Sequence, residues 1–361
     1  MSNILNFIRE KSYYLLCATI ILIIVFIIIG ACSNNTVKTY DAIESDMVIA
    51  AKQYYEDRNG LLPKENNASV RVSISSLVES ELMSEVVDPE EKSKTCNGYV
   101  EVTKLDDEYS YIPFLTCEGN YEPQYLIDKI KAEKTDELGN GVYYVDGAYV
   151  YRGKTVNNYV NFNEQLWRII NVNEDGVIKL VLAEKLQSTY NWDTQYNSEK
   201  KGNYGITTNY LYTNIRQSLN RYYDTNFTKE SKAKMVKQNL CVGSYLSTDA
   251  FNKEKECSVK TAGEYVGLLN VSDYYYSSLD ENCKTLKSRE CGNRNYLYNS
   301  DINTWTLNPV DKTTYKVFYI SSGVNSSYAK SSKKINPVIY LSSNVLINDG
   351  NGTFKNPYII K

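Results

Sequence analysis

The most apolar stretch of the chain lies close to its N-terminus. Residues 12–37 contain no charged side chain, and residues 13–31 form an almost unbroken apolar run. As an α-helix these 19 residues would rise about 28 Å, close to the roughly 30 Å hydrocarbon core of a bilayer. The pattern therefore predicts a single N-terminal transmembrane helix at residues 12–32, after a short tail at residues 1–11.

Charged residues on either side of this span predict its orientation. Arg9 and Lys11 precede it, whereas acidic side chains follow at positions 41, 44 and 46. Because the cytoplasmic flanks of membrane helices carry the excess of basic residues, we expect the N-terminus in the cytoplasm and residues 33–361 outside the cell. The sequence thus indicates a single-pass protein of the cell membrane that contacts the bilayer through its N-terminal helix.

A cysteine at the end of the apolar run supports an alternative anchor. The segment Ile29-Gly30-Ala31-Cys32, followed by polar residues 33–35, resembles the lipobox of bacterial lipoproteins. This resemblance implies lipidation of Cys32. The apolar run is longer than the roughly 7–15 residues of a signal-peptide core, which favours an uncleaved signal anchor. Under either reading the product is tethered to the membrane and exported.

The segment after the span predicts a small α+β domain at residues 33–120. Apolar residues recur at three- and four-residue spacing up to Asn59-Gly60, which is typical of an amphipathic helix that ends at a turn. Alternating apolar and polar runs further along predict strands. We expect helices at 36–58 and 75–84 and strands at 70–74, 99–104 and 109–116.

Six of the eight cysteines lie beyond the apolar run, and we expect all six in disulfides. An even number of cysteines in an exported region favours disulfide bonds. No Cys-x-x-Cys motif occurs, which weakens a zinc or thiol–redox interpretation. The six are Cys96, Cys117, Cys241, Cys257, Cys283 and Cys291.

Hairpin geometry pairs two of these cysteines. A two-residue turn at Asp106-Asp107 aligns the flanking strands so that paired residue numbers sum to 213, as those of Cys96 and Cys117 do. In this register the two face each other in a non-hydrogen-bonded pair, with Cα atoms about 4.5 Å apart, which suits a disulfide. The pairing of the other four stays open, and the sequence neighbours 241–257 and 283–291 are the simplest choice.

Beyond the hairpin, the pattern predicts a linker and a larger domain. Residues 121–141 are polar and charged, with a short helix at 124–134. From 142 to 361, short runs bounded by turn residues predict an α+β domain with a largely antiparallel sheet. Strands are expected at 142–145, 148–152, 159–162, 166–172, 177–183, 317–321, 337–341, 345–347 and 358–360, and helices at 211–223 and 229–236.

Residues 13–120 combine an apolar helix, an amphipathic helix and a small cysteine-linked sheet. Short sequence echoes at residues 50–55, Asp88-Pro89 and residues 94–100 accompany this order, and together they resemble a type IV pilin or pseudopilin. The Gly-Phe-Thr-x-x-Glu cleavage motif of prepilins is absent before the apolar run. The resemblance therefore implies a pilin-like stalk rather than a working filament subunit.

The second domain carries several short motifs built around aromatic residues. They are Tyr151-Arg152-Gly153, Asn158-Tyr159-Val160, Trp192-Asp193 and residues 166–170, 267–274, 305–307 and 336–341. In this combination the domain is similar to a family of uncharacterised surface domains of Firmicutes, often found behind pilin-like N-termini. It also looks distantly like C-type lectin and formylglycine-generating-enzyme folds, but the Glu-Pro-Asn and Trp-Asn-Asp motifs of calcium-dependent lectins are absent. The resemblance implies a surface domain and no particular activity.

Composition excludes several classes of function. The chain has no histidine and a formal net charge of -3, so Ser-His-Asp triads, Cys-His dyads and histidine-based zinc sites are impossible. A slightly acidic chain is also a poor match for nucleic acid. Neither a glycine-rich phosphate loop nor a nucleophile elbow occurs. We therefore expect no catalytic residue, no cofactor, no metal ion and no nucleic-acid partner.

Tryptophans provide the candidates for ligand binding. Trp167 and Trp305 lie in mostly apolar runs and are expected in the core. Trp192 and Asp193 lie in the polar segment 187–209, where we expect them to be exposed and to contact a ligand.

These observations lead to a membrane-anchored, exported surface protein that binds an extracellular glycan or protein without catalysis. One alternative is a structural minor pilin or a component of a secretion system, acting through residues 33–120. A second alternative is a carboxylate-dependent cell-wall hydrolase, which would require a pair of carboxylates in a cleft.

Overall fold

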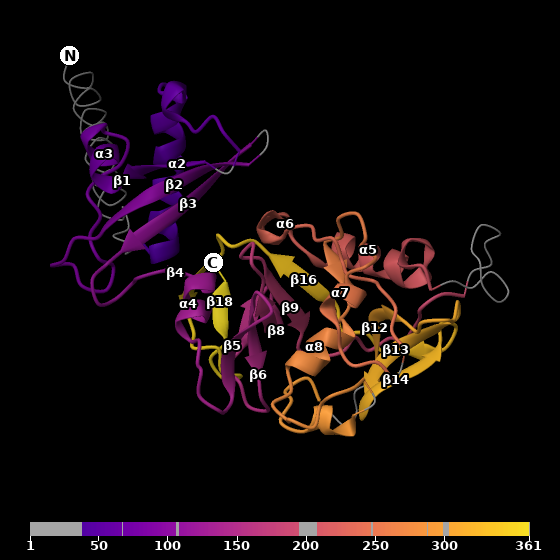
Figure 1. Ribbon diagram of the computed structural model, residues 1–361. Coiled ribbons are helices and arrows are strands. Elements are labelled where there is room, and N and C mark those ends of the chain that lie inside the picture. The colour runs from indigo at the N-terminus through magenta and orange to yellow at the C-terminus, as the bar shows by residue number, and fades with distance from the viewer. Residues whose placement is uncertain are drawn as a thin grey trace, which may run out of the picture. The chain divides into compact units, whose positions relative to one another are not determined.

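The computed structural model describes residues 38–66, 68–105, 108–194, 208–246, 248–286, 288–298 and 303–360. This part of the chain mixes helices and strands, which confirms the α+β class, and it divides into two compact units between Glu122 and Pro123 (Figure 1). None of the helices within these ranges has the length and apolar character that a bilayer crossing requires. The predicted span at residues 12–32 and the lipidation candidate Cys32 lie outside the described residues.

The first unit packs one long helix, α2, against a three-stranded antiparallel sheet of order β1-β2-β3 (Figure 1). Its elements follow the predicted order, although the second helix ends at Glu79 instead of continuing to residue 84. They are α2 (Tyr40–Glu56), the 3-10 turn η1 (Asn59–Leu61), β1 (Ser69–Ser73), α3 (Ile74–Glu79), β2 (Asn97–Leu105) and β3 (Glu108–Thr116).

Helix α2 begins at a side-chain cap and is held by one buried face. The Thr39 hydroxyl oxygen accepts a hydrogen bond from the N–H of Ala42 (3.2 Å), which satisfies one of the free donors at the helix start. The buried apolar residues recur at the predicted helical spacing, and most helical stability in proteins comes from such a face. They are Ile43, Met47, Ala50, Ala51 and Tyr55.

The hairpin of β2 and β3 has the predicted register. Val100 lies opposite Pro113 and Asn97 opposite Thr116, so Cys96 and Cys117 come next in the same alignment. Their Cα atoms are 4.4 Å apart and their sulfur atoms are bonded. Pro113 is tolerated here because β3 is an edge strand of the sheet. The disulfide that strand geometry predicted is confirmed.

The second unit is built on a ten-stranded sheet. Its main path runs β11-β16-β9-β8-β7-β18-β17-β4, with β6 on β8 and β5 on β6. Among the described strand pairs, β18 with β7 is parallel and the others are antiparallel. The strands are β4 (Gln124–Tyr125), β5 (Gly141–Val145), β6 (Ala148–Arg152), β7 (Tyr159–Phe162), β8 (Gln165–Val172), β9 (Ile178–Leu182), β11 (Val266–Gly267), β16 (Val338–Leu341), β17 (Leu346–Asp349) and β18 (Tyr358–Ile360).

Helices and two smaller sheets complete the second unit (Figure 1). The sheets are β12 (Thr304–Pro309), β13 (Lys316–Ser321) and β14 (Gly323–Tyr328) in that order, and β10 (Tyr190–Asn191) paired with β15 (Ser332–Lys333). The helices are α4 (Leu126–Ala132), η3 (Tyr210–Tyr212), α5 (Asn214–Asn226), α6 (Lys229–Lys234), α7 (Lys253–Glu256), α8 (Val271–Tyr276) and η4 (Arg289–Gly292). The pattern predicted neither β12 nor β14.

The predicted linker at residues 121–141 is instead largely part of the second unit. Strand β4 pairs with β17, and α4 buries Leu126, Ile127 and Ile130 in the same core as the large sheet. Ile130 follows Leu126 by four positions and Ile127 by three, which places its side chain beside both of theirs on the buried side of the helix. A few well-placed apolar side chains thus dock a segment whose composition is otherwise typical of a linker.

Candidate functional site

Trp192 and Asp193, the expected ligand contacts, are buried in the second unit. Both residues are 0% exposed. The Trp192 indole N–H donates to the carbonyl of Thr306 (3.0 Å), and the backbone N–H groups of Trp192 and Asp193 both donate to the carbonyl of Ala329. The prediction that this pair is exposed is therefore wrong. A tryptophan in a polar segment can still be buried when its indole N–H has a hydrogen-bond partner inside the core, as here.

The six cysteines of the two units form three disulfides. Beside Cys96–Cys117, the bonds join Cys241 to Cys257 and Cys283 to Cys291, with Cα separations of 4.4 and 4.5 Å. These are the pairs of sequence neighbours. Because every cysteine among the described residues is bonded to another, none of them offers a thiolate for nucleophilic or metal chemistry.

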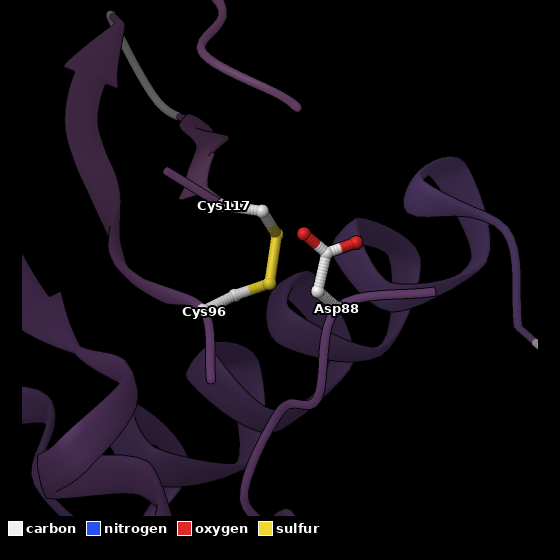
Figure 2. Close-up of side chains that lie close together, drawn as sticks. All are labelled: Asp88, Cys96 and Cys117. Carbon is white, nitrogen blue, oxygen red and sulfur yellow. A yellow bond between two sulfur atoms is a disulfide. The ribbon is translucent and has the colours of Figure 1, made fainter. Parts of the chain in front are cut away.

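Asp88 lies beside the Cys96–Cys117 disulfide, as Figure 2 shows. The three residues would have the ligand types of a metal site, but two of the three candidate ligands are sulfurs bonded to each other. The Asp88 carboxylate, 0% exposed, is instead surrounded by donors. It accepts hydrogen bonds from the Tyr40 hydroxyl (2.9 Å), the Asn120 amide (2.9 Å) and the backbone N–H groups of Glu90 (2.9 Å) and Glu91 (3.4 Å).

These hydrogen bonds make Asp88 a structural junction of the first unit. Burial alone would raise the pKa of the Asp88 carboxyl, but the donors around it outweigh burial and lower that pKa. The carboxylate ties α2 to the loop after residue 88 and to the turn that follows Cys117. The cluster therefore stabilises the fold and has no free ligand position for a metal.

The structure has a prominent hollow in each unit. In the first unit a hollow of about 720 Å³ lies between α2 and residues 82–92. Its wall mixes apolar and charged side chains, and two of the charged residues, Lys38 and Asp46, pair with each other at 2.6 Å. Because Asp88, which also lines it, is held by the structural hydrogen bonds described above, we do not assign a site there.

The hollow of the second unit, which we call the Arg168 pocket, has a volume of about 600 Å³. This volume is within the range of pockets that bind small ligands. Its wall combines basic, aromatic and amide side chains over a floor of strands β7, β8 and β9. The lining residues are Lys154, Tyr159, Arg168, residues 181–185, Gln187, Leu269, residues 296–298 and Asn336.

Arg168 is held between two tyrosine rings. Its guanidinium carbon lies 4.3 Å from the ring centre of Tyr159 and 4.4 Å from that of Tyr296. Such cation–π contacts are worth about 0.5–2 kcal/mol each, depending on exposure. Burial lowers the pKa of the Arg168 guanidinium, which nonetheless keeps its charge because arginine titrates far above neutral pH.

Hydrogen bonds fix the same guanidinium along its edge. Nε donates to the side-chain oxygen of Asn158 (2.9 Å), and Nη1 donates to the carbonyl of Tyr296 (3.3 Å). Asn158 is fully buried and donates its own amide to the carbonyl of Ile169 (2.7 Å), so its orientation is set by the strand. The arginine is therefore preorganised and not a mobile surface side chain.

Strand register explains why these residues meet. Tyr159 on β7 is the antiparallel partner of Arg168 on β8, so both side chains stand on the same face of the sheet. Tyr296 comes from a segment far along the chain, and its hydroxyl donates to the carbonyl of Ile169 (3.3 Å). The clamp thus joins a local hairpin to a distant loop.

Asn336 adds an amide with unused acceptor capacity to the pocket wall. It is 8% exposed and donates through Nδ2 to the carbonyl of Leu182 (3.1 Å). Its Oδ1 has no hydrogen-bond partner within the described part of the chain. Pro337 restricts the residue before it to extended backbone, which helps to hold Asn336 in place. A buried acceptor without a partner is costly, but Oδ1 is itself buried, so Asn336 shapes the wall of the pocket and offers no exposed acceptor to a ligand.

A second polar cluster lies inside the unit but does not line the pocket. Lys179, in the middle of β9, donates to Asp273 Oδ2 (2.6 Å), and Ser272 Oγ donates to Glu256 Oε1 (2.5 Å). All four residues are at most 9% exposed. Burial raises the pKa of Glu256 to about 8, with a smaller contribution from Asp273. We interpret this cluster as a structural network because its four residues are buried and line neither of the two hollows described above.

Comparisons with known proteins give no guide to this pocket. Neither a scan against family models nor searches of curated proteins and of solved structures found a match. The pilin-like and lectin-like resemblances therefore remain interpretations of the sequence.

Four pocket residues lie in the motifs that carry the second resemblance: Tyr159, Arg168, Leu269 and Asn336. Sequence reasoning did not single out any of them as a site residue. The available signal was the arginine at the centre of an otherwise apolar strand, Leu166-Trp167-Arg168-Ile169-Ile170.

Proposed function

We propose that this protein is an exported surface protein, anchored in the cell membrane by its N-terminal segment, that binds an extracellular glycan or protein in the Arg168 pocket. The first unit then acts as a pilin-like stalk that presents the second unit. The observation that carries the proposal is the preorganised arginine, clamped by Tyr159 and Tyr296 in a pocket of about 600 Å³.

Export is supported by the disulfides. Three bonds in a chain of this size are typical of an oxidising compartment and are rare in the cytosol. Protease added to intact cells should therefore degrade the units, and thiol labelling of the unreduced protein should leave the six cysteines unmodified. Protection from protease together with labelling of all six positions would contradict export.

Binding fits the pocket better than hydrolysis does. A glycosidase of the usual kind needs two carboxyl groups facing the scissile bond. Among the described residues that line the Arg168 pocket, Glu184 supplies the one carboxylate. The buried pair of Asp273 and Glu256 belongs to the internal network and is 5% and 3% exposed.

A binding array tests the proposal with a matched pair of variants. The full chain, purified in mild detergent, should bind at least one member of a glycan and extracellular-protein array. Tyr298, 38% exposed, lines the pocket, whereas Tyr328, 51% exposed on β14, does not. We expect Tyr298→Ala to reduce the signal strongly and Tyr328→Ala to leave it unchanged. Equal signals from both variants would place the binding surface elsewhere.

A second candidate is a structural subunit of a pilus or secretion assembly. The packing of α2 on a three-stranded sheet whose hairpin is closed by a disulfide favours it. This function predicts that the protein sediments with surface filaments, and that it can be crosslinked to them through Ile49, an exposed residue of α2 (56%). Recovery only as dispersed monomers would contradict the assembly role and leave the binding role intact.

A further inference from the structure

The Arg168 guanidinium can meet a ligand through its edge but not through its two faces. Tyrosine rings lie 4.3 and 4.4 Å from its centre, and Nε and Nη1 are used by Asn158 and Tyr296. Within the described part of the chain, no hydrogen bond engages Nη2. An arginine whose faces are covered binds through its edge, and the edge of a guanidinium matches the paired oxygens of a carboxylate or a sulfate.

The charges around the pocket favour an anion. Among the described residues of its wall, Lys154 and Arg168 supply positive charge, and Glu184 is the one acid. Arg168 is partly buried without a carboxylate of its own, since its described hydrogen bonds go to an amide and a carbonyl. An incoming anionic group would compensate this buried positive charge.

The remaining wall favours a sugar over an extended peptide. Strands β7, β8 and β9 are paired on both sides in the order β16-β9-β8-β7-β18, so the floor offers no free edge for strand addition. Tyr298 lines the pocket, is 38% exposed and offers an aromatic face. Such a face suits the C–H face of a carbohydrate ring.

From this arrangement we infer that the Arg168 pocket binds an acidic oligosaccharide, whose carboxylate or sulfate pairs with Arg168 while a sugar ring packs on Tyr298. This inference rests on the proposed binding function and specifies the ligand class of the same site. Lys154 contributes long-range attraction at the exposed rim of the pocket.

Titration of the full chain in mild detergent with three related ligands tests the class. The ligands are a hexuronate oligosaccharide, the same oligosaccharide with its carboxyl groups reduced, and a sulfated oligosaccharide of equal length. We expect the acidic ligands to bind about tenfold or more tightly than the neutral one, because hydrogen bonds to charged groups contribute more than neutral ones. Comparison of the two acidic ligands identifies the anionic group.

Substitutions connect binding to the residues. Tyr298→Ala should reduce the affinity for the preferred acidic ligand about tenfold. Lys154→Gln should reduce this affinity less and should make it depend less on the salt concentration. Lys330→Gln, at an exposed position outside the pocket, is the matched control and should change neither. Arg168→Gln should abolish the preference for acidic ligands, provided that the intrinsic tryptophan fluorescence shows an unchanged fold.

The outcomes separate the ligand class from the proposed function. Equal affinity for neutral and acidic ligands, still lost in Tyr298→Ala, would overturn the acidic class and leave the binding function in place. Acidic binding that persists in Tyr298→Ala and Arg168→Gln would overturn the assigned site. Failure of all three ligands, together with an empty array, would overturn both.

Discussion

Replacement of Lys179 by methionine should destabilise the second unit by several kcal/mol. Lys179 is 8% exposed and donates to Asp273 (2.6 Å) and to Asn270 (3.3 Å). Burial alone would lower the pKa of Lys179, but the nearby carboxylate of Asp273 outweighs burial and raises it. Methionine has a similar length and no charge, so the substitution leaves Asp273, 5% exposed, without its cation.

The size of the stability loss depends on whether the Asp273 carboxylate stays ionised without its cation or takes up a proton. Breaking a buried ion pair by removing one partner typically costs about 3–5 kcal/mol. A buried aspartate can instead take up a proton, which from an ordinary pKa of about 3.9 costs about 4 kcal/mol at pH 7 and about 1.5 kcal/mol at pH 5. We therefore expect a loss of about 4 kcal/mol in the free energy of unfolding at pH 7, and a clearly smaller loss at pH 5.

Tryptophan fluorescence isolates this transition. All three tryptophans, Trp167, Trp192 and Trp305, lie buried in the second unit, so guanidinium unfolding of the full chain followed at tryptophan wavelengths reports on that unit alone. Lys255→Met is the control, because Lys255 forms a more exposed ion pair with Asp249, at 2.7 Å and 38% side-chain exposure. Such pairs contribute about 0–1 kcal/mol.

A double variant separates a lost ion pair from a packing defect. Lys179→Met with Asp273→Asn removes both charges, while the asparagine oxygen can still accept the N–H of Asn270, which Asp273 now accepts at 2.7 Å. The double variant should recover most of the stability lost in Lys179→Met. Three results would refute the reasoning. Lys179→Met could lose no more stability than Lys255→Met, or its loss could be the same at pH 5 and pH 7. The double variant could also be as unstable as Lys179→Met alone.

Two further stability changes follow from the structure. Burial raises the pKa of Glu256 from 4.5 to about 8, so the folded state binds a proton that the unfolded state releases. The free energy of unfolding should therefore fall as the pH rises from about 4.5 to 8, by up to about 1.4 kcal/mol per pH unit, and Glu256→Gln should flatten this slope in tryptophan-monitored unfolding. Replacement of Cys96 and Cys117 by serine removes a bond that spans 21 residues and should cost the first unit about 3 kcal/mol. Hydrogen exchange in α2 should then accelerate while the tryptophan transition stays unchanged, and a change confined to the second unit would contradict this assignment.

Sequence patterns predicted the helices and strands whose formation depends on residues close to them in the chain. Helix α2 repeats its apolar residues at helical spacing, and the sum rule for a two-residue turn placed Cys96 opposite Cys117. Both arguments need only neighbouring residues and backbone geometry. The central strand β8 was also predictable, since its apolar run could be satisfied only inside a sheet.

Elements that depend on distant partners were missed. Residues 124–125 form a strand only because residues 346–347 pair with them, and the predicted linker carries no sign of that partner. Trp192 was misplaced for the same reason. Its indole N–H is satisfied by Thr306, more than a hundred positions further along the chain, and nothing in its polar surroundings indicates this.

Only part of the Arg168 pocket could be predicted from its local sequence. An arginine at the centre of an apolar strand must be compensated by polar or aromatic groups, because an unpaired charge in a sheet is costly. Its strand partner Tyr159 could be read from the hairpin. Tyr296 instead comes from a distant loop, and Asn336 lies just before β16, which pairs with the neighbouring β9. The strand order β16-β9-β8-β7 therefore assembles the pocket. A charged residue that interrupts a predicted central strand is thus a reason to look for a site at that point of the sheet, before aromatic residues in polar loops are considered.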